Sequence, residues 1–527
     1  MSISLGQPCD EGLVLSRGAT APCTEASARW ILVATILGSS MAFIDGTVVN
    51  VALAKLQANL DATVPQVQWV MEAYSLLLAA FLLLGGSLGD HYGRRRLFLL
   101  GVVVFALASL WCGLAPNIGQ LIAARALQGL GGALLVPGSL AIIGASFSER
   151  SRSSAIGTWS AFTAITTAIG PVVGGWLIEQ VSWRAVFFIN LPLALIVVII
   201  SFFHVPESRD ETERQKLDWA GAILTVIGLG LLTYGLIESS RSGFANFAVI
   251  GTLAGGTVVL LLLLGFEARA PNPMIPAALF RSRNFSGANL LTFLLYGALS
   301  GALFFFPLNL IQVQRYSATA AGAALLPFTL ILFLLSRSGG GLVERLGAKT
   351  TLVIGPIIVA AGFVLFAFPS VGSNYWQTFF PAVVVLGLGM ATSVAPLAAT
   401  VMNAVTENRV GIASGINNAI SRCAALLAIA AFGIVMLHVF DHSLDRRLAA
   451  LELSPKTRQV LDAERVKLAG ATLPEEIAPS LRVAIRRAIN DSFVKGFRYI
   501  MLVGAGLSVA SAISSFVLID GRRNSPK

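Results

Sequence analysis

Long apolar runs dominate the sequence and leave few ways for the chain to fold. Fourteen of them are long enough to cross roughly 30 Å of hydrocarbon, which takes about 20 helical residues. Only 12% of the 527 residues are charged, whereas charged residues make up about 25% of soluble domains. The sequence therefore predicts an all-α membrane protein with 14 transmembrane helices.

Basic residues occur mainly in alternate links between the apolar runs, as in Arg94–Arg96, and this bias predicts that those links and both termini are cytoplasmic. The net charge of +10 is thus interpreted as a topology signal, and no nucleic-acid partner is expected. The link 441–495 is an exception, because it is rich in Lys and Arg but falls on the extracytoplasmic side. Long segments are translocated largely regardless of charge. Its spaced leucines and valines predict an amphipathic helix on the bundle or on the membrane surface.

A glycine-rich basic link, Gly85–Arg96, separates the second and third apolar runs. A similar link occurs 254 residues later at Gly340–Lys349, and Leu127–Ala133 is echoed by Leu386–Ala391. These repeats predict two related six-helix halves with two helices inserted between them, an architecture typical of transporters. The expected parts are a disordered cytoplasmic tail (1–28), a first bundle (29–205), an inserted helix pair with its flanking loops (206–285) and a second bundle (286–527) that includes the extracytoplasmic loop 441–495.

Ionisable residues are rare inside the apolar runs, and each is a candidate functional residue because burying a charge in a membrane is costly. Asp45, Glu72 and Arg125 are predicted to lie in one layer, at similar depths in the first, second and fourth spans. A carboxyl beside an arginine in such a layer is suited to binding and releasing a proton. The alternative is that Asp45 and Arg125 form a permanent ion pair that holds two helices together.

The spacing of the cysteines suggests neither a metal site nor a redox site. The four cysteines are Cys9, Cys23, Cys112 and Cys423, and none has metal-ligand spacing. Neither metal nor cofactor is expected. Arg422, in the thirteenth span, has no acidic partner in the spans of the second half, and backbone carbonyls are its expected partners.

Four segments resemble motifs of the major facilitator superfamily, in its fourteen-helix drug:proton antiporter branch. GGSLGDHYGRRR (85–96) is similar to the link between helices two and three, and IDGTVVNVAL (44–53) to the first-helix motif. LIAARALQGLGGA (121–133) resembles the proton-coupling motif of helix four, and AIGPVVGG (168–175) the helix-five motif of exporters. Ala54 departs from the first-helix motif, which usually ends in proline.

The resemblance implies roles for specific residues. The resemblance implies that Asp45 and Arg125 take part in proton coupling, and Glu72 is a third candidate because it is an ionisable residue inside the second span. The candidate cytoplasmic latch comprises Gly86, Asp90, Gly93, Arg94 and Arg95, and its counterpart in the second half comprises Gly340, Glu344, Gly347 and Lys349. The candidate hinge or outer seal comprises Gly170, Pro171, Gly174 and Gly175.

These features predict a proton-coupled multidrug exporter of amphipathic or hydrophobic small molecules in the cell membrane. The proton gradient would supply the energy, and the two bundles would open the substrate site alternately to each side of the membrane. The expected unit is a lipid-embedded monomer without enzymatic activity. Phenylalanines offer adaptable apolar contacts for such substrates. The candidate cavity residues are Phe162, Phe293, Phe304, Phe305 and Arg422. A dedicated exporter of one metabolite is the alternative, and a membrane-embedded sensor or enzyme is a more remote one.

Overall fold

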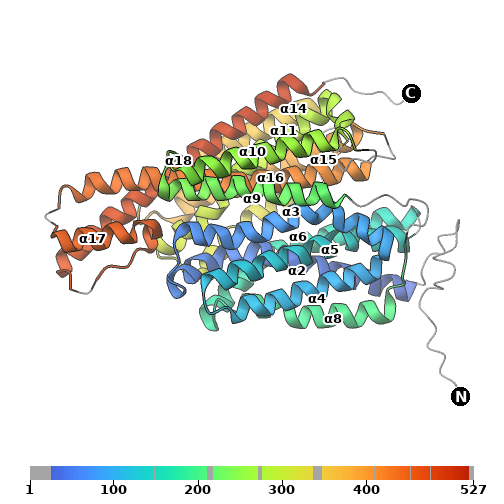
Figure 1. The fold of residues 1–527 in the computed structure, drawn as a ribbon, viewed down its shortest axis with the longest axis horizontal. Helices are drawn as coiled ribbons and strands as arrows, with labels where there is room; N and C mark the ends of the chain where they lie inside the picture. The colour runs from blue at the N-terminus through green and yellow to red at the C-terminus, as the bar shows by residue number, and fades with distance from the viewer. Residues whose placement is uncertain are drawn as a thin grey trace, which may run out of the picture. The chain divides into compact units, whose positions relative to one another are not determined.

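The computed structural model describes residues 25–147, 149–209, 218–270, 276–335, 347–406, 410–451, 453–474 and 476–520. In these ranges the chain forms helices joined by short links, without a strand (Figure 1). Thirteen helices there are long and apolar enough to cross a membrane, or fourteen if the bent pair Val64–Leu82 and Leu84–Tyr92 is one span. The predicted all-α membrane fold is confirmed.

Within residues 25–147 and 149–209 the structure has seven helices. They are α2 (Glu25–Asn59), α3 (Val64–Tyr92), α4 (Arg94–Leu114), α5 (Ile118–Ser146), α6 (Glu149–Gln180), α7 (Ala185–Phe188) and α8 (Asn190–His204).

The described residues 326–335 are also helical, and the other helices follow in order along the chain. They are α9 (Trp219–Ser242), α10 (Phe247–Glu267), η1 (Ala277–Arg281), α11 (Arg283–Leu308), η2 (Asn309–Val313), α12 (Ala318–Ala323), α14 (Ala348–Phe366), η3 (Tyr375–Phe379), α15 (Phe380–Asn403), α16 (Val410–Leu448), α17 (Pro455–Glu464), η5 (Arg465–Gly470) and α18 (Pro479–Leu518).

Contacts divide the chain into two compact units. The first comprises Met1–Val49, Val70–Val226 and Arg269–Met274, and the second comprises Asn50–Trp69, Ile227–Ala268 and Ile275–Lys527. The division therefore passes through α2, α3 and α9. Of the boundaries predicted from sequence, 205/206 falls in the link after α8, whereas 28/29 and 285/286 fall in the first turns of α2 and α11. The predicted bundles 29–205 and 286–527 remain a prediction, and most of the predicted tail 1–28 lies outside the described residues.

Glycines allow two helices to cross closely in each unit. In the first unit, a Cβ added at Gly131 of α5 would lie 2.6 Å from the backbone nitrogen of Phe105 in α4 and 3.0 Å from the Gly101 carbonyl oxygen. In the second, a Cβ added at Gly389 of α15 would lie 2.6 Å from the backbone nitrogen of Val359 in α14. Such small-residue contacts let membrane helices pack backbone to backbone. The offset of 254–258 residues relates the two crossings, which supports the predicted duplication.

A glycine with positive φ precedes one helix of each crossing. Gly93 precedes α4 with φ of 111°, and Gly347 precedes α14 with φ of 82°. A side chain would strain either backbone, because positive φ is readily adopted only by glycine. Gly93 has a second constraint, since an added Cβ would lie 2.7 Å from a carboxylate oxygen of Glu207.

The inserted helices α9 and α10 pack on each other through glycines as well. A Cβ added at Gly256 of α10 would lie 2.8 Å from the carbonyl oxygen of Gly228 in α9. Trp69 of α3 lies beside Tyr234 of α9, with ring centroids 6.4 Å apart. The pair therefore has its own interface and a contact with α3 within the second unit.

Two helices extend beyond the spans that hydropathy predicts and take up much of the predicted loop 441–495. α16 continues to Leu448 and α18 begins at Pro479, with Leu444 and Ile485 buried in these extensions. Polar residues on the opposite faces lower the mean hydropathy there, so an amphipathic extension is missed. The segment 449–478, with α17 and η5, connects the extensions at one end of the second unit (Figure 1).

This segment is held by Lys467, whose side chain is only 11% exposed. Its Nζ lies 2.5 Å from Asp61 in the turn between α2 and α3 and 2.6 Å from Glu464. The Lys467 carbonyl accepts a hydrogen bond from Gln57 Nε2 at 3.0 Å, and Gln57 Oε1 accepts one from Gln312 at 2.8 Å. Asp61 has φ of 49°, a conformation that Asp tolerates in turns. The α2–α3 turn and the segment 449–478 are thus joined by an ion pair and by hydrogen bonds of the Gln57 side-chain amide.

We predict that the attachment of the segment 449–478 to the α2–α3 turn is stable between about pH 5 and 10 and is lost in acid. Burial alone raises the pKa of Glu464, but hydrogen bonds from Lys467 and Thr472 outweigh it and hold the pKa below its ordinary 4.5. Burial alone lowers the pKa of Lys467, but hydrogen bonds to Asp61 and Glu464 outweigh it and raise the pKa above 10.5. Stabilisation from the carboxyl is present above pH 4.5 and is lost as pH falls through its folded pKa. Stabilisation from the ammonium is lost only as pH rises through its own raised pKa.

Hydrogen exchange or limited proteolysis of 449–478 at a series of pH values would measure this. Lys467→Gln should leave the segment exposed at neutral pH, whereas Lys456→Gln should behave as wild type, because Lys456 pairs with Glu476 on the surface with both side chains about 80% exposed. Equal protection of the segment in both variants would contradict the prediction.

Candidate functional site

A charge pair is buried in the first unit between α2 and α5. Arg125 Nη1 donates to Asp45 Oδ2, and both side chains are 0% exposed. Breaking such a buried pair by removing one partner costs roughly 3–5 kcal/mol, because the other charge is left uncompensated. The structure thus brings together two of the three predicted proton-coupling residues.

Neutral amides and hydroxyls extend the pair to α4 and α8. Gln128 Oε1 accepts from Arg125 at 2.7 Å, and Gln128 Nε2 donates to Asp45 Oδ1 at 2.9 Å. Gln128 Nε2 also lies 3.3 Å from Ser109 Oγ, which accepts from Asn190 Nδ2 at 3.0 Å. Arg125 and Gln128 are three residues apart, so they share one face of α5. One glutamine therefore contacts both charges of the pair.

The other side of Arg125 contacts α3. Arg125 Nε donates to the Val70 carbonyl at 3.1 Å, and its guanidinium carbon lies 4.2 Å from the centre of the Tyr74 ring. The close approach depends on Gly129, where an added Cβ would lie 2.3 Å from the Tyr74 carbonyl oxygen. Arg125 is thus held by backbone, ring and amide as well as by Asp45, and its position does not rest on the carboxylate alone.

Glu72 lies on α3 apart from this pair. Its side chain is fully buried, and neither carboxyl oxygen has a hydrogen-bond partner among the described residues. Val70 and Tyr74 lie on one face of α3, whereas Glu72 is turned from each by about 200° at 100° per residue. The structure therefore does not place two acids against one arginine.

The predicted seal glycines pack on α2 next to Asp45. A Cβ added at Gly174 of α6 would lie 1.7 Å from Val48 Cγ2, and one at Gly170 would lie 2.7 Å from Thr47 Oγ1. Pro171 lies inside α6, and both Pro171 and Gly175 are buried. The two helices thus approach closely along the stretch of α2 that carries Asp45.

The candidate latch spans the last turns of α3 and the first turn of α4, with only Gly93 between the two helices, and it is paired within the first unit. Arg94 Nε donates to Asp90 Oδ1 at 2.7 Å. Glu207, after α8, accepts from the Arg95 backbone nitrogen at 3.1 Å and lies 3.5 Å from Arg96 Nε. Glu207 therefore caps the start of α4, where a negative charge is favoured by the helix dipole.

The remaining latch residues fall in several environments. In α3, Gly86 has room, since an added Cβ would lie 3.7 Å from Pro137 Cβ. Gly340 and Glu344 of the second-half latch lie outside the described residues. Lys349, one residue after the start of α14, lies 4.9 Å above the ring of Phe516 in α18.

The candidate cavity residues do not share one environment. Phe304 and Phe305 are fully buried in α11 with ring centroids 4.9 Å apart, whereas Phe162 of α6 is 50% exposed and Phe293 of α11 is 37% exposed. Arg422 is partly buried on α16. Packing therefore separates the exposed phenylalanines from those in the core.

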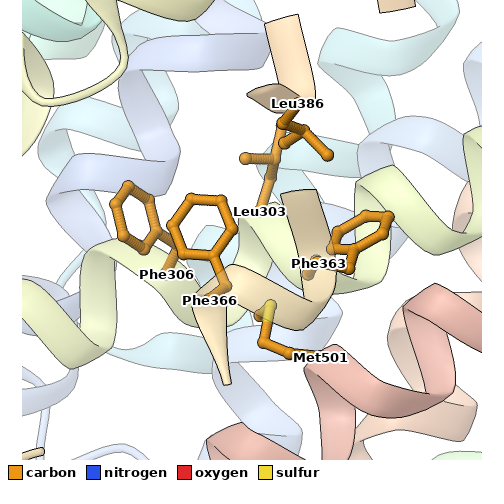
Figure 2. A pocket seen from close by; sticks show the side chains of 7 residues that line it. Leu303, Phe306, Phe363, Phe366, Leu386 and Met501 are labelled. Carbon is orange, nitrogen blue, oxygen red and sulfur yellow. The ribbon is translucent and has the colours of Figure 1, made fainter. Parts of the chain in front are cut away.

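A small void lies in the apolar core of the second unit (Figure 2). Its volume is about 10 Å³, and the labelled side chains around it are Leu303, Phe306, Phe363, Phe366, Leu386 and Met501. A buried water needs about that volume and two or more polar partners, so this lining favours a dry void. It is far too small for a drug-sized molecule.

Sequence reasoning missed Gln128, Glu207 and Lys467. The first could have been found from its spacing to Arg125. Glu207 gives no local signal, because it is 112 residues from Arg95, which it meets together with Arg96 only in the folded chain. Lys467 and Asp61 are 406 residues apart, so nothing local in the sequence connects them. Among the described residues, no group of three or more His, Cys, Asp or Glu is arranged to hold a metal ion.

A sequence model of the family described as Major Facilitator Superfamily matches residues 35–430. The Multidrug resistance protein Stp of Mycobacterium tuberculosis (strain CDC 1551 / Oshkosh) is 33% identical over 510 residues, 94% of this chain and 92% of that protein. The Tetracenomycin C resistance and export protein of Streptomyces glaucescens is 30% identical over 493 residues, covering 92% and 90%.

Solved structures show the same fold at low sequence identity. A bacterial homolog to the human lysosomal transporter Spinster has a TM-score of 0.66 at 16% identity, covering 93% of this chain and 98% of that one. The xylose transporter XylE from E. coli has a TM-score of 0.57 at 13% identity, covering 94% and 97%.

Gly174→Ala is expected to destabilise the protein by roughly 1–3 kcal/mol, as overpacking in well-packed cores does. Val48 is β-branched and cannot turn away freely from the added methyl group. Thermal unfolding in detergent would measure the change in melting temperature. Gly157→Ala is the matched control in α6, because an added Cβ there meets nothing within 4 Å. Equal melting temperatures for the two variants would show that the close packing of α6 on α2 contributes nothing.

Proposed function

The chain belongs to the Major Facilitator Superfamily, and we propose that it is a proton-coupled exporter of amphipathic, largely apolar small molecules. It would act in the cell membrane by alternating access, with both termini in the cytoplasm. The observation that carries the proposal is the fully buried pair of Asp45 and Arg125. Support for the substrate class comes from relatives named for multidrug and antibiotic resistance.

The charge pair has the parts of a proton switch. A proton bound by Asp45 removes the negative charge that faces Arg125 and so breaks the ion pair. Arg125 would keep the Val70 carbonyl, Tyr74 and Gln128 as partners. Gln128 could then adjust to either charge state, since its amide both donates and accepts. Binding a proton would thereby change the contacts between α2 and α5 without releasing the arginine.

Close packing would transmit this change to α6. Gly170 and Gly174 contact α2 at Thr47 and Val48, within three residues of Asp45. A shift of α2 on protonation of Asp45 would therefore change how α6, which contains Pro171, packs on α2. We propose that Glu72 is a second proton-binding group, acting separately from the charge pair because it makes no contact with it.

The charges available in the second half favour uncharged or weakly charged substrates. Helices α11, α14 and α15 contain neither Asp nor Glu, and the acids of α16 and α18, which are Asp441, Asp445 and Asp491, lie in the extensions of these helices within 441–495. A site for permanently cationic drugs would need a carboxylate or an aromatic cage. Phe162 and Phe293, which are exposed, are the proposed apolar contacts.

A dedicated exporter is the second candidate, because one relative is named for resistance to, and export of, a single antibiotic, tetracenomycin C. A panel of chemically unrelated compounds would separate the two. Transport of several unrelated compounds supports a multidrug exporter, and transport of one compound supports the dedicated exporter.

Asp45→Asn is expected to reduce substrate-dependent proton movement at least about tenfold, since an amide cannot carry the proton. Everted membrane vesicles with a pH-sensitive dye would measure proton movement when substrate is added. Glu238→Gln in α9 is the matched control, because Glu238 accepts a hydrogen bond from Ser242 away from the charge pair. Full coupling in Asp45→Asn would refute the proposed role of the pair.

A further inference from the structure

A polar cleft of about 510 Å³ lies in the second unit, where α16, α18 and the link after α14 meet. It is lined by three cationic side chains, Arg447, Lys495 and Arg498, and by one carboxylate, Asp491. The cleft therefore carries an excess of positive charge. It lies outside the residues assigned above to proton coupling or to substrate.

The three cations differ in how they are held. Arg447 Nη1 pairs with Asp491 Oδ2 at 2.8 Å, and Arg498 Nε donates to the Ala367 carbonyl at 2.7 Å. Lys495 has neither an ion-pair nor a hydrogen-bond partner in the part of the chain that the structure describes. Two cations, Lys495 and Arg498, thus form no ion pair with a carboxylate of the described residues. An anion in the cleft would form charge-assisted hydrogen bonds with both.

The cleft continues into an exposed apolar stripe on α18. Leu502, Val509, Ile513 and Phe516 are 43–64% exposed and follow one another at helical spacing. Lys495, Arg498 and Tyr499 continue that spacing at the end of the stripe nearer the start of α18. One face of the helix is therefore apolar along its length and cationic at one end.

The length of the stripe matches a bilayer. Eighteen residues separate Arg498 from Phe516, which is about 27 Å at 1.5 Å per residue, close to the roughly 30 Å of hydrocarbon. Another cation, Lys349, lies 4.9 Å over the Phe516 ring at the far end. Tyr499, which lines the cleft and is exposed, is of a type enriched at the membrane–water interface. The cleft is thus placed at the level of lipid headgroups.

We propose that the cleft binds the headgroup of an anionic phospholipid. Its phosphodiester would contact Lys495 and Arg498, and an acyl chain would lie along Leu502 and Val509. The apolar stripe makes a lipid the occupant rather than free phosphate, because a free ion would use only the cationic end.

Native mass spectrometry of the purified full-length protein with added phosphatidylglycerol or phosphatidylcholine tests this. Wild type should retain more phosphatidylglycerol than phosphatidylcholine. Lys495→Gln should lower the retained phosphatidylglycerol about fivefold, the effect of one basic residue at a membrane surface, and should leave phosphatidylcholine unchanged. Lys495→Arg should restore retention. Since Lys495 has no described protein partner, its replacement is not expected to disturb the fold.

Arg487→Gln is the matched control, because Arg487 is an exposed basic residue on the same helix about 12 Å further along. It should retain phosphatidylglycerol as wild type does. Equal retention in Lys495→Gln and wild type would overturn the proposal, and so would equal retention of the two lipids by wild type. Displacement of phosphatidylglycerol by millimolar inorganic phosphate would assign the cleft to free phosphate instead and would also overturn it.

Discussion

The ion pair between Asp45 and Arg125 is the interaction on which the rest of the first unit depends. Two charges removed from water are stabilised when their geometry is good and their remaining hydrogen bonds are made. Among the described residues, Arg125 Nη2 has no hydrogen-bond partner, and the other polar groups around the pair make theirs through Gln128 and the Val70 carbonyl. Gln128 contacts both charges, while Val70 and Tyr74 occupy the other side of the arginine. The pair is therefore a central point of contact for α2, α3 and α5, and Gln128 extends it towards α4 and α8.

Glycine is the second constraint, because these contacts require helices that approach more closely than ordinary side chains allow. Gly129 brings α5 against Tyr74, and Gly174 brings α6 against Val48. The crossing of α4 with α5 at Gly131 recurs in the second unit as the crossing of α14 with α15 at Gly389. The same close packing thus supports Arg125 of α5 in one unit, whereas α15 of the second unit contains neither an arginine nor an acid. This asymmetry is consistent with the proposal that proton coupling takes place in the first half.

Much of the fold could be predicted from the sequence, because apolar length and repeated glycine motifs are local signals. The candidate charges could be predicted as well, since few ionisable residues occur inside the spans. The sequence could not show which neighbouring helix a side chain faces, because this depends on how the helices pack. Glu72 differs from Val70 and Tyr74 by only two positions, yet it faces away from Arg125. Gln128 carries no charge and lies among small residues, and Lys467 meets Asp61 only through the folded chain.

The central claim is that Asp45 gains and loses a proton during the transport cycle. Infrared difference spectroscopy of the purified protein, recorded when a transported compound is added, would detect this directly. We predict a carbonyl band of a protonated carboxyl group that changes on substrate addition in wild type and is missing from the difference spectrum of Asp45→Asn. A spectrum with no such change in wild type, or the same band in Asp45→Asn, would contradict the claim.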